Sequence, residues 1–396
     1  MKEISKIASA VQPSTTLKVD ALYKQMKEEG KDVIGFGAGE PDFDTPDNIA
    51  QVAIKAIKDG MTKYTPANGI PALRQAVADR LLKDCGAEYD AGQIVVASGA
   101  KHNIYVALKV LLNPGDEVIL PAPYWVTYEE AIRMAGGVPV IIQTPETNGF
   151  KITPLQLKVA ITGKTKLFII NNPCNPTGTL YNEDEIRALA EICAKSDLYI
   201  LSDEIYYQLV YGGKKFTSFA TLGDDIKERT ILVNGVSKTY AMTGWRIGYT
   251  ASNTQLAKIM GNYLSHSTSS PSTISQIAAV EALKGSQESV IAMRDVFEQR
   301  RDFVVDRINS IDGLSCIKPD GAFYVMLNIE KQIGKTLGGK QINNSDDFSL
   351  ALLESNLVAA VSCTGFGCDN FLRITYAASM DSIKKGLDRI ESFVSV

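Results

Sequence analysis

The feature that most constrains the fold is a regular alternation of strand-like and helix-like segments between about Gln93 and Thr250. The strand-like segments are short and apolar without strict alternation, which is typical of strands buried on both faces. Their alternation with helices predicts βαβ units and an α/β fold with a mostly parallel central sheet covered by helices on both faces. The expected strands are residues 93–97, 117–120, 138–142, 166–170, 198–201 and 230–233, and the expected helices between them are residues 101–112 and 127–134.

A second unit is expected after about Gly285, where the pattern changes. Helical patterns over 286–309 and 346–354 alternate with strand patterns over 323–327 and 371–376, and a helix closes the chain, which together indicate a smaller α+β domain. Residues 333–345, rich in Gly, Lys and Asn, are expected to form a surface loop. Because 396 residues exceed what one core usually serves, we expect a large domain over residues 46–285 and a small domain made of residues 1–45 and 286–396.

Composition excludes several classes of function. The formal net charge is -4, from 41 basic and 45 acidic residues, so the chain lacks the basic excess that favours nucleic acid or anionic membranes. No signal-peptide pattern or apolar run of about 18 residues is present. The six cysteines are scattered and make no CxxC pair, which favours reduced thiols and a cytoplasmic location. With only two histidines, a zinc site or a Ser-His-Asp triad is poorly supplied, and no metal is expected.

The residues that are candidates for catalysis or ligand binding follow separate strands of the expected sheet. In open α/β sheets, ligands bind at the carboxyl ends of the strands, so these residues could converge on one crevice. They are the segments 98–101, 171–175, 203–204 and 237–238. Each segment, taken singly, is also compatible with a plain structural role such as a helix cap, an ion pair or a tight turn.

Three of these residues, together with Arg246, favour a particular chemistry. Gly99 stands where a strand meets a helix, and the free N–H groups of a helix N-terminus suit a phosphate. Asp203 ends an apolar strand, where a carboxylate can hold a heterocyclic nitrogen in its protonated form. Lys238 follows another buried strand, and a lysine with a depressed pKa can form a Schiff base. Arg246, eight residues later, is expected to open a further strand and could grip a phosphate.

These segments together resemble the class I aminotransferases, the fold type I enzymes that use pyridoxal 5'-phosphate, and within them the bacterial-type aspartate aminotransferase subgroup. The motifs that carry the resemblance are residues 39–43, 64–66, 123–125, 172–178, 202–206, 237–249 and 372–376, which cover nearly the whole chain. A fold type I enzyme has a large cofactor-binding domain and a smaller domain, and it acts as a homodimer.

The resemblance assigns a role to each matching residue. Lys238, Asp203 and Tyr206 are then the catalytic residues: Lys238 carries the cofactor as an imine and moves the proton, Asp203 holds the pyridine nitrogen, and Tyr206 binds the phenolic oxygen. The remaining cofactor contacts are assigned to Gly99, Ala100, Lys101, Trp125, Asn175, Ser237 and Arg246, and to Tyr64 reaching in from the second subunit. The substrate contacts are assigned to Gly39, Lys101, Trp125, Asn175 and Arg373, of which Arg373 binds the α-carboxylate.

The reaction implied is a ping-pong transamination from L-aspartate to 2-oxoglutarate, giving oxaloacetate and L-glutamate. In this subgroup the lysine at the Lys101 position is associated with a distal carboxylate, and Ser14 and Thr15 could add polar contacts. An aminotransferase for prephenate, aromatic amino acids or alanine is the alternative on the same scaffold, as is a β-lyase. Gln12 stands where relatives that accept prephenate carry a basic residue. A non-catalytic protein that binds the cofactor and a partner is the remaining hypothesis from another class.

Overall fold

The computed structural model describes residues 3–5, 8–9, 11 and 16–395. Its central feature is a seven-stranded sheet in the order β2-β8-β7-β6-β5-β3-β4. The pairs among β7, β6, β5, β3 and β4 are parallel, and β8 is antiparallel to both of its neighbours. The prediction of a mostly parallel sheet is therefore confirmed. The strands are β2 (Ile94–Ala97), β3 (Glu117–Ala122), β4 (Val138–Gln143), β5 (Thr165–Asn171), β6 (Tyr199–Asp203), β7 (Thr230–Gly235) and β8 (Gly248–Ala251).

Helices cover both faces of this sheet, because successive residues of its strands point to opposite sides. In β5, Leu167 and Ile169 enter one hydrophobic cluster, whereas Phe168 and Ile170 enter another. The first cluster lies beneath α5 (Ala100–Leu111), α6 (Thr127–Ala135) and α10 (Thr254–Ser267). The opposite face is covered by α7 (Pro154–Ala160) and α8 (Glu183–Lys195), with α4 (Pro71–Cys85) and α11 (Thr273–Lys284) over its other end. The double burial explains the continuous apolar runs in the sequence.

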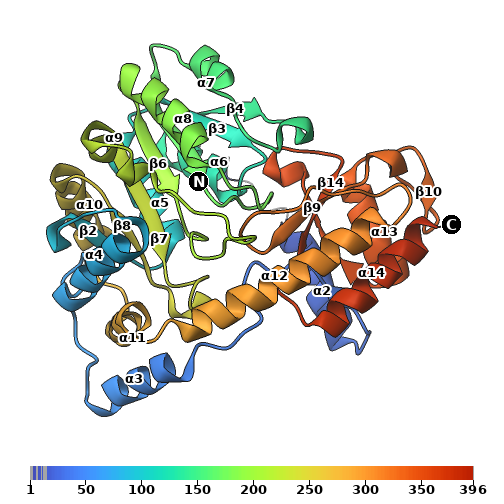
Figure 1. Ribbon diagram of the computed structural model, residues 1–396, viewed down its shortest axis with the longest axis horizontal. Coiled ribbons are helices and arrows are strands. Elements are labelled where there is room, and N and C mark those ends of the chain that lie inside the picture. The colour runs from blue at the N-terminus through green and yellow to red at the C-terminus, as the bar shows by residue number, and fades with distance from the viewer. Residues whose placement is uncertain (1–2, 6–7, 10, 12–15, 396) are drawn as a thin grey trace.

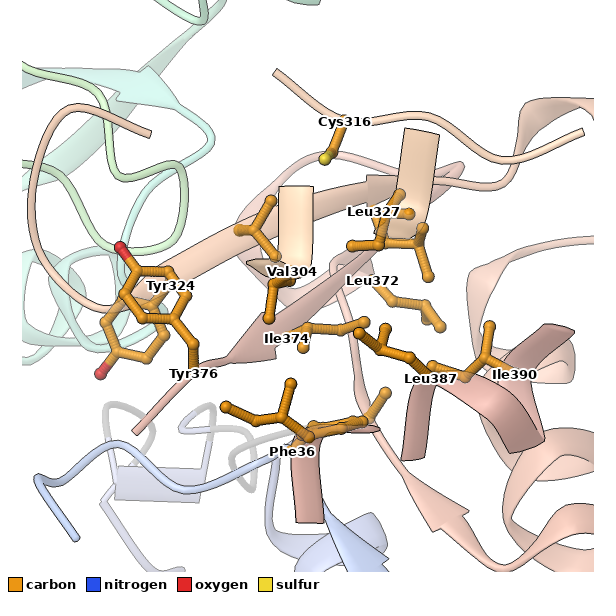
Figure 2. Packing of buried hydrophobic residues seen from close by; sticks show 14 of the residues in the cluster. Phe36, Val304, Cys316, Tyr324, Leu327, Leu372, Ile374, Tyr376, Leu387 and Ile390 are labelled. Carbon is orange, nitrogen blue, oxygen red and sulfur yellow. The ribbon is translucent and has the colours of Figure 1, made fainter. Parts of the chain in front are cut away.

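A second, three-stranded antiparallel sheet has the order β13-β14-β9, with β9 (Tyr324–Asn328), β13 (Val361–Ser362) and β14 (Phe371–Thr375). Its core is packed by α12 (Glu288–Asn309), α13 (Ser345–Asn356) and α14 (Met380–Val394), and Figure 2 shows Val304, Leu372 and Leu387 meeting there. The N-terminal residues join this unit. Strand β1 (Ile34–Gly35) pairs with β12 (Val358–Ala359), and α2 (Thr16–Glu28) packs on α13 and β12.

The division into two domains stays a prediction, which the two separate sheets and the β1-β12 pairing support. Between the N-terminal segment and the large sheet, α3 (Asp47–Lys58) extends away from the body of the molecule and packs on α11 (Figure 1). Within the described residues, no helix is both long and apolar enough to cross a membrane.

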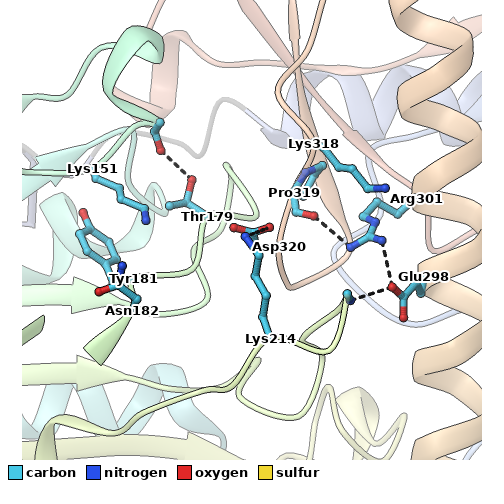
Figure 3. Close-up of polar contacts among 12 residues, drawn as sticks. Lys151, Thr179, Tyr181, Asn182, Lys214, Glu298, Arg301, Lys318, Pro319 and Asp320 are labelled. Atoms are coloured by element: carbon cyan, nitrogen blue, oxygen red, sulfur yellow. Dashed lines mark hydrogen bonds and ion pairs between the residues drawn. The ribbon is translucent and has the colours of Figure 1, made fainter. Parts of the chain in front are cut away.

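A loop over residues 317–321, just before β9, contacts the loops that follow β5 and β6 of the large sheet (Figure 3). Arg301 donates a 3.2 Å hydrogen bond to the Pro319 carbonyl, and Asp320 pairs with Lys214 at 2.7 Å. The backbone of Gly178 accepts hydrogen bonds from Asp320 and the next amide, both at 2.9 Å. A Cβ at Gly178 would lie 2.5 Å from the Pro319 ring, so this contact requires glycine.

The expected surface loop over residues 333–345 is wrong in part, because it contains an antiparallel hairpin. Strands β10 (Thr336–Leu337) and β11 (Lys340–Gln341) pair there. The two residues between them, Gly338 and Gly339, both have positive φ, at 55° and 77°. A Gly-Gly pair between two short segments is a known signal for a tight hairpin turn, so this element could have been predicted.

Candidate active site

The carboxyl ends of β5, β6 and β7 bring the predicted residues to one place. Asn171 and Asp203 end neighbouring strands and are paired in register. The Asn171 amide donates to the Asp203 carbonyl at 2.9 Å, and its oxygen accepts from the Asn175 backbone amide at 2.7 Å. Asn175 is therefore fixed by a side chain at the strand end rather than by turn propensity alone. The sequence indicated a rigid loop here but not this contact.

Asp203 is buried, and its carboxylate accepts hydrogen bonds from the Tyr128 hydroxyl at 2.7 Å and the Ile205 amide at 3.2 Å. Burial raises the pKa of Asp203 to about 6, although both hydrogen bonds and the charge of Lys238 oppose that rise. Because burial outweighs these three interactions, the positive charge near the carboxylate is not enough to hold its pKa at the ordinary value. A cationic group placed against Asp203 would restore its charged form.

Lys238 lies three residues beyond the end of β7, and its Nζ donates to the Gly39 carbonyl at 2.5 Å. Burial is the main reason that the pKa of Lys238 falls to about 8. The nearby charge of Glu40 opposes the fall, whereas Arg373 and Arg246 add to it. An amine with this pKa is far more often unprotonated at neutral pH than an ordinary lysine, which suits a nucleophile.

Arg246 and the start of α5 form a compact cradle. A Cβ at Gly99, which has φ of 92°, would lie 2.4 Å from Arg246 Nη2, so glycine is required for the guanidinium to approach the backbone. The guanidinium donates to the carbonyls of Thr243 at 2.8 Å and Ser98 at 3.4 Å, and no carboxylate pairs with it among the described residues. The expectation that Arg246 opens a strand is wrong: it precedes β8 by two residues and has a positive φ of 57°.

Ala100 and Lys101 begin α5, and the first amides of a helix have no partner within the helix. The Lys101 ammonium lies 4.9 Å from the centre of the Trp125 ring. Burial, and then the charge of Arg246, lower the pKa of Lys101. Ser237, which is buried, lies immediately before Lys238. Two cations, free helix amides and a positive helix end without a carboxylate partner suit an anionic ligand.

Arg373 is 5% exposed and has no carboxylate partner among the described residues, which is costly for a buried cation. Its guanidinium donates to the Asn175 side-chain oxygen at 3.1 Å and to the Gly37 carbonyl at 2.8 Å. It lies between two aromatic rings, 4.5 Å from the centre of Tyr324 and 5.2 Å from that of Phe366. Its Nε, although buried, has no hydrogen-bond partner in the part of the chain that the structure describes. A carboxylate from a ligand would satisfy both the charge and the free donor.

Tyr206 is buried beside Asp203, and its hydroxyl lies 3.1 Å from the hydroxyl of Tyr324. Burial raises the pKa of Tyr206 well above its ordinary value. Neither Tyr128 nor Tyr324 is predicted from the sequence. Tyr128 follows Trp125 by three residues at the start of an expected helix, which was a usable signal. Tyr324 reaches the site only through the packing of two sheets, which no local pattern shows.

Tyr64 is not brought to these residues within one chain: it is 95% exposed and makes no hydrogen bond among the described residues. Gln12, Ser14 and Thr15 lie outside the described residues. The other predicted site residues make the contacts given above or are adjacent in sequence to a residue that does.

Comparison with known proteins identifies the family. The family model for class I and II aminotransferases matches residues 31–390. The chain is 47% identical to an aspartate aminotransferase of Bacillus subtilis (strain 168) over 99% of both chains. It is 45% identical to an aspartate/prephenate aminotransferase of Cereibacter sphaeroides over 99% of both. The crystal structure of an aspartate aminotransferase from Rhizobium meliloti superposes with a TM-score of 0.96 at 41% identity, covering 100% of this chain and 99% of that one. The chain therefore belongs to the class I and II aminotransferase family.

Proposed function

We propose that this chain is an aspartate aminotransferase that binds pyridoxal 5'-phosphate on Lys238 and transfers the amino group of L-aspartate to 2-oxoglutarate. The products are oxaloacetate and L-glutamate, formed in two half-reactions. The observation that carries the proposal is Lys238, whose amine has a pKa of about 8 and lies among Gly39, Asp203 and Arg373. The relatives named aspartate aminotransferase support the same conclusion.

The residues present fit pyridoxal phosphate on three independent grounds. Arg246 and the glycine-opened helix start supply donors for its phosphate without a competing carboxylate. Asp203, whose pKa is raised by burial, lacks the cation that a protonated ring nitrogen would provide. Trp125 offers a partly buried aromatic face beside Lys101 for stacking. When bound, the cofactor supplies a covalent handle for the amine and an electron sink for the bond breaking at the substrate Cα.

The protein residues then divide the work of the reaction. Asp203 would keep the ring nitrogen protonated through a charge-assisted hydrogen bond. Tyr206 and Asn175 would donate to the phenolic oxygen. Lys238 Nζ would hold the cofactor covalently and, when free, would act first as general base and then as general acid for the proton at the substrate Cα. Its lowered pKa suits both steps, because the group changes protonation state near neutral pH.

Two cations select the substrate. Arg373 binds the α-carboxylate in the geometry that its planar fork allows, supported by the backbone near Gly39. Lys101, which lies over Trp125 and near the charge of Arg246, binds the distal carboxylate, whose negative charge would favour the protonated form of Lys101. A dicarboxylic amino acid therefore matches both ends of the site, whereas alanine matches only one.

A second candidate function is transamination of prephenate, favoured by the relative named aspartate/prephenate aminotransferase. Initial rates with aspartate, alanine and phenylalanine as donors, and with prephenate as acceptor, separate the candidates. We expect aspartate to be the best donor. Aspartate among the poorest donors would refute the role given to Lys101, and release of pyruvate and ammonia without a keto acid would indicate a β-lyase instead.

We further propose that the chain works as a homodimer in the cytoplasm, with Tyr64 completing the partner's phosphate site. Three apolar side chains near Tyr64 in sequence are solvent-exposed in a single chain: Ile54 at 43%, Ile57 at 56% and Met61 at 48%. Exposed apolar surface of this kind is typical of an interface. Sedimentation analysis of the holoenzyme is expected to give twice the chain mass. Tyr64→Phe is expected to weaken cofactor binding without dissociating the dimer.

The experiment that tests the central proposal compares wild type with Lys238→Ala. Wild type is expected to show a visible absorbance band that changes on adding aspartate. The variant is expected to bind the cofactor without covalent attachment and to lose nearly all turnover. No band in wild type, or turnover at wild-type speed in the variant, would refute the proposal.

A further inference from the structure

Tyr324 joins the two sheets at the centre of the site. It stands at the start of β9 in the three-stranded sheet, and its hydroxyl lies 3.1 Å from that of Tyr206, just beyond β6 of the large sheet. Its ring supports the Arg373 guanidinium at 4.5 Å. A Cβ at Gly39 would lie 3.4 Å from the Tyr324 hydroxyl, so the Gly39 backbone is close as well. One buried side chain thus contacts two of the proposed ligand-binding residues, Tyr206 and Arg373, and lies close to a third, Gly39.

The hydrogen bond between the two hydroxyls has a defined direction once Tyr206 has a ligand. A phenol donates one hydrogen and accepts others. If Tyr206 donates its hydrogen to the phenolic oxygen of the cofactor, only Tyr324 can supply the hydrogen between the two tyrosines. Burial raises the pKa of both phenols, so both retain their protons at working pH. The two bonds then polarise each other in the same direction.

We propose that Tyr324 is a positioning residue that acts through Tyr206: its hydroxyl donates to Tyr206 and thereby strengthens the hydrogen bond from Tyr206 to the phenolic oxygen of the cofactor. This inference rests on the proposed function and adds a residue to it. The ring and the hydroxyl have separate tasks, because the ring packs on Arg373 whereas the hydroxyl serves Tyr206.

Tyr324→Phe separates these tasks, because it removes the hydroxyl and keeps the ring. Without its donor, Tyr206 stabilises negative charge on the phenolic oxygen less well, and the bound cofactor becomes more basic. We expect the pH midpoint of the visible absorbance band of the holoenzyme to rise by about half a unit. The dissociation constant of succinate, a dicarboxylate that tests Arg373, should change by less than about threefold, since the cation–π contact remains.

Tyr376→Phe is a matched control. Tyr376 is another fully buried tyrosine at the same end of the core cluster (Figure 2), and its hydroxyl donates to the Ala322 carbonyl at 3.3 Å. Among the described residues, it makes no hydrogen bond or ring contact with Tyr206, Arg373 or Gly39. The Tyr376→Phe variant also loses one buried hydroxyl, but the pH midpoint of its absorbance band should equal that of wild type.

A double-mutant cycle provides the decisive measurement. In a Tyr206→Phe background, the Tyr324 hydroxyl has no Tyr206 hydroxyl to which it can donate. Adding Tyr324→Phe should then no longer move the pH midpoint of the absorbance band. An unmoved midpoint in Tyr324→Phe alone, or an equal shift with and without Tyr206, would overturn the inference. A wild-type protein without any visible band would overturn the proposed function, and this inference with it, whereas a normal band that is insensitive to Tyr324 overturns this inference alone.

Discussion

The Tyr128 hydroxyl donates a 2.7 Å hydrogen bond to Oδ2 of the buried Asp203 carboxylate. Helix α6 thereby orients the strand-end residue that we assign to the cofactor nitrogen. Because burial already raises the pKa of Asp203 to about 6, each donor that stabilises the charged form matters at neutral pH.

Replacing Tyr128 with Phe is therefore expected to raise the pKa of Asp203 further and to weaken cofactor binding. A hydrogen bond to a charged group contributes roughly 1.5–2 kcal/mol, which corresponds to about a 10- to 30-fold loss of affinity. The loss of cofactor affinity should be greatest at acidic pH, because Asp203 of the variant takes up its proton at a higher pH than Asp203 of wild type. Equilibrium binding of pyridoxal phosphate between pH 5.5 and 8 measures it. Tyr124→Phe, which removes a hydroxyl bound to Glu129, is the control and should bind normally.

Gly99→Ala tests the phosphate cradle. The added Cβ would lie 2.4 Å from Arg246 Nη2, and the positive φ of 92° is unfavourable for alanine by roughly 1–3 kcal/mol. We expect cofactor affinity to fall at least about tenfold, since Arg246 must move away from the helix start. Gly92→Ala is the matched control, because a Cβ there meets nothing within 4 Å. Equal cofactor affinity in the two variants would contradict the cradle.

The sequence predicted the strand ends well because burial on both faces leaves a clear apolar pattern, and polar residues such as Asp203 stand out where each strand stops. It could not predict contacts made by packing between distant segments. Arg373 meets Asn175, 198 positions away, and the Tyr324 hydroxyl meets that of Tyr206 across 118 positions. These pairs depend on how the second sheet sits against the first. The resemblance assigned Arg373 a role, but its stacking between two rings became visible only in three dimensions.

Glu204 makes stability depend on pH. It is buried, one carboxylate oxygen accepts from Ser202 and Ser218 at 2.8 Å each, and the other has no partner among the described residues. Burial, reinforced by Asp203, raises the pKa of Glu204 to about 8 from an ordinary 4.5. The folded state therefore holds the proton more tightly than the unfolded state. The stability contributed by protonated Glu204 is complete below pH 4.5 and is lost progressively as the pH rises to about 8.

Glu204→Gln removes this dependence, because the amide stays neutral and resembles the protonated acid. We expect the variant to gain stability relative to wild type as the pH rises, by roughly 3 kcal/mol at pH 7 compared with pH 4.5. Urea unfolding at pH 5, 6.5 and 8 measures the difference. Glu183→Gln, at an exposed position, should show no such trend. Parallel curves for wild type and Glu204→Gln would mean that Glu204 does not carry a proton in the folded state.

Arg373→Lys tests whether the buried cation recognises a carboxylate by shape as well as charge. Lysine keeps the charge but loses the planar fork and the stacking between two rings. We expect the KM for aspartate to rise about 30-fold, equivalent to roughly 2 kcal/mol, while cofactor binding stays near wild type. Arg307→Lys, at a partly buried arginine that pairs with Asp388 and Glu391, is the control. A change in kcat without a change in KM or in succinate affinity would assign Arg373 another role.

Lys101→Met tests the selection of the distal carboxylate. The variant keeps the backbone amide at the helix start and a side chain of similar length over Trp125, so the phosphate cradle and the packing survive. Only the charge is lost. We therefore expect kcat/KM for aspartate to fall by about 10- to 100-fold, as for loss of a charged partner, while phenylalanine changes by less than about threefold. If both donors lost activity equally, Lys101 would serve the cofactor alone. Substrate preference would then have to come from residues other than Lys101.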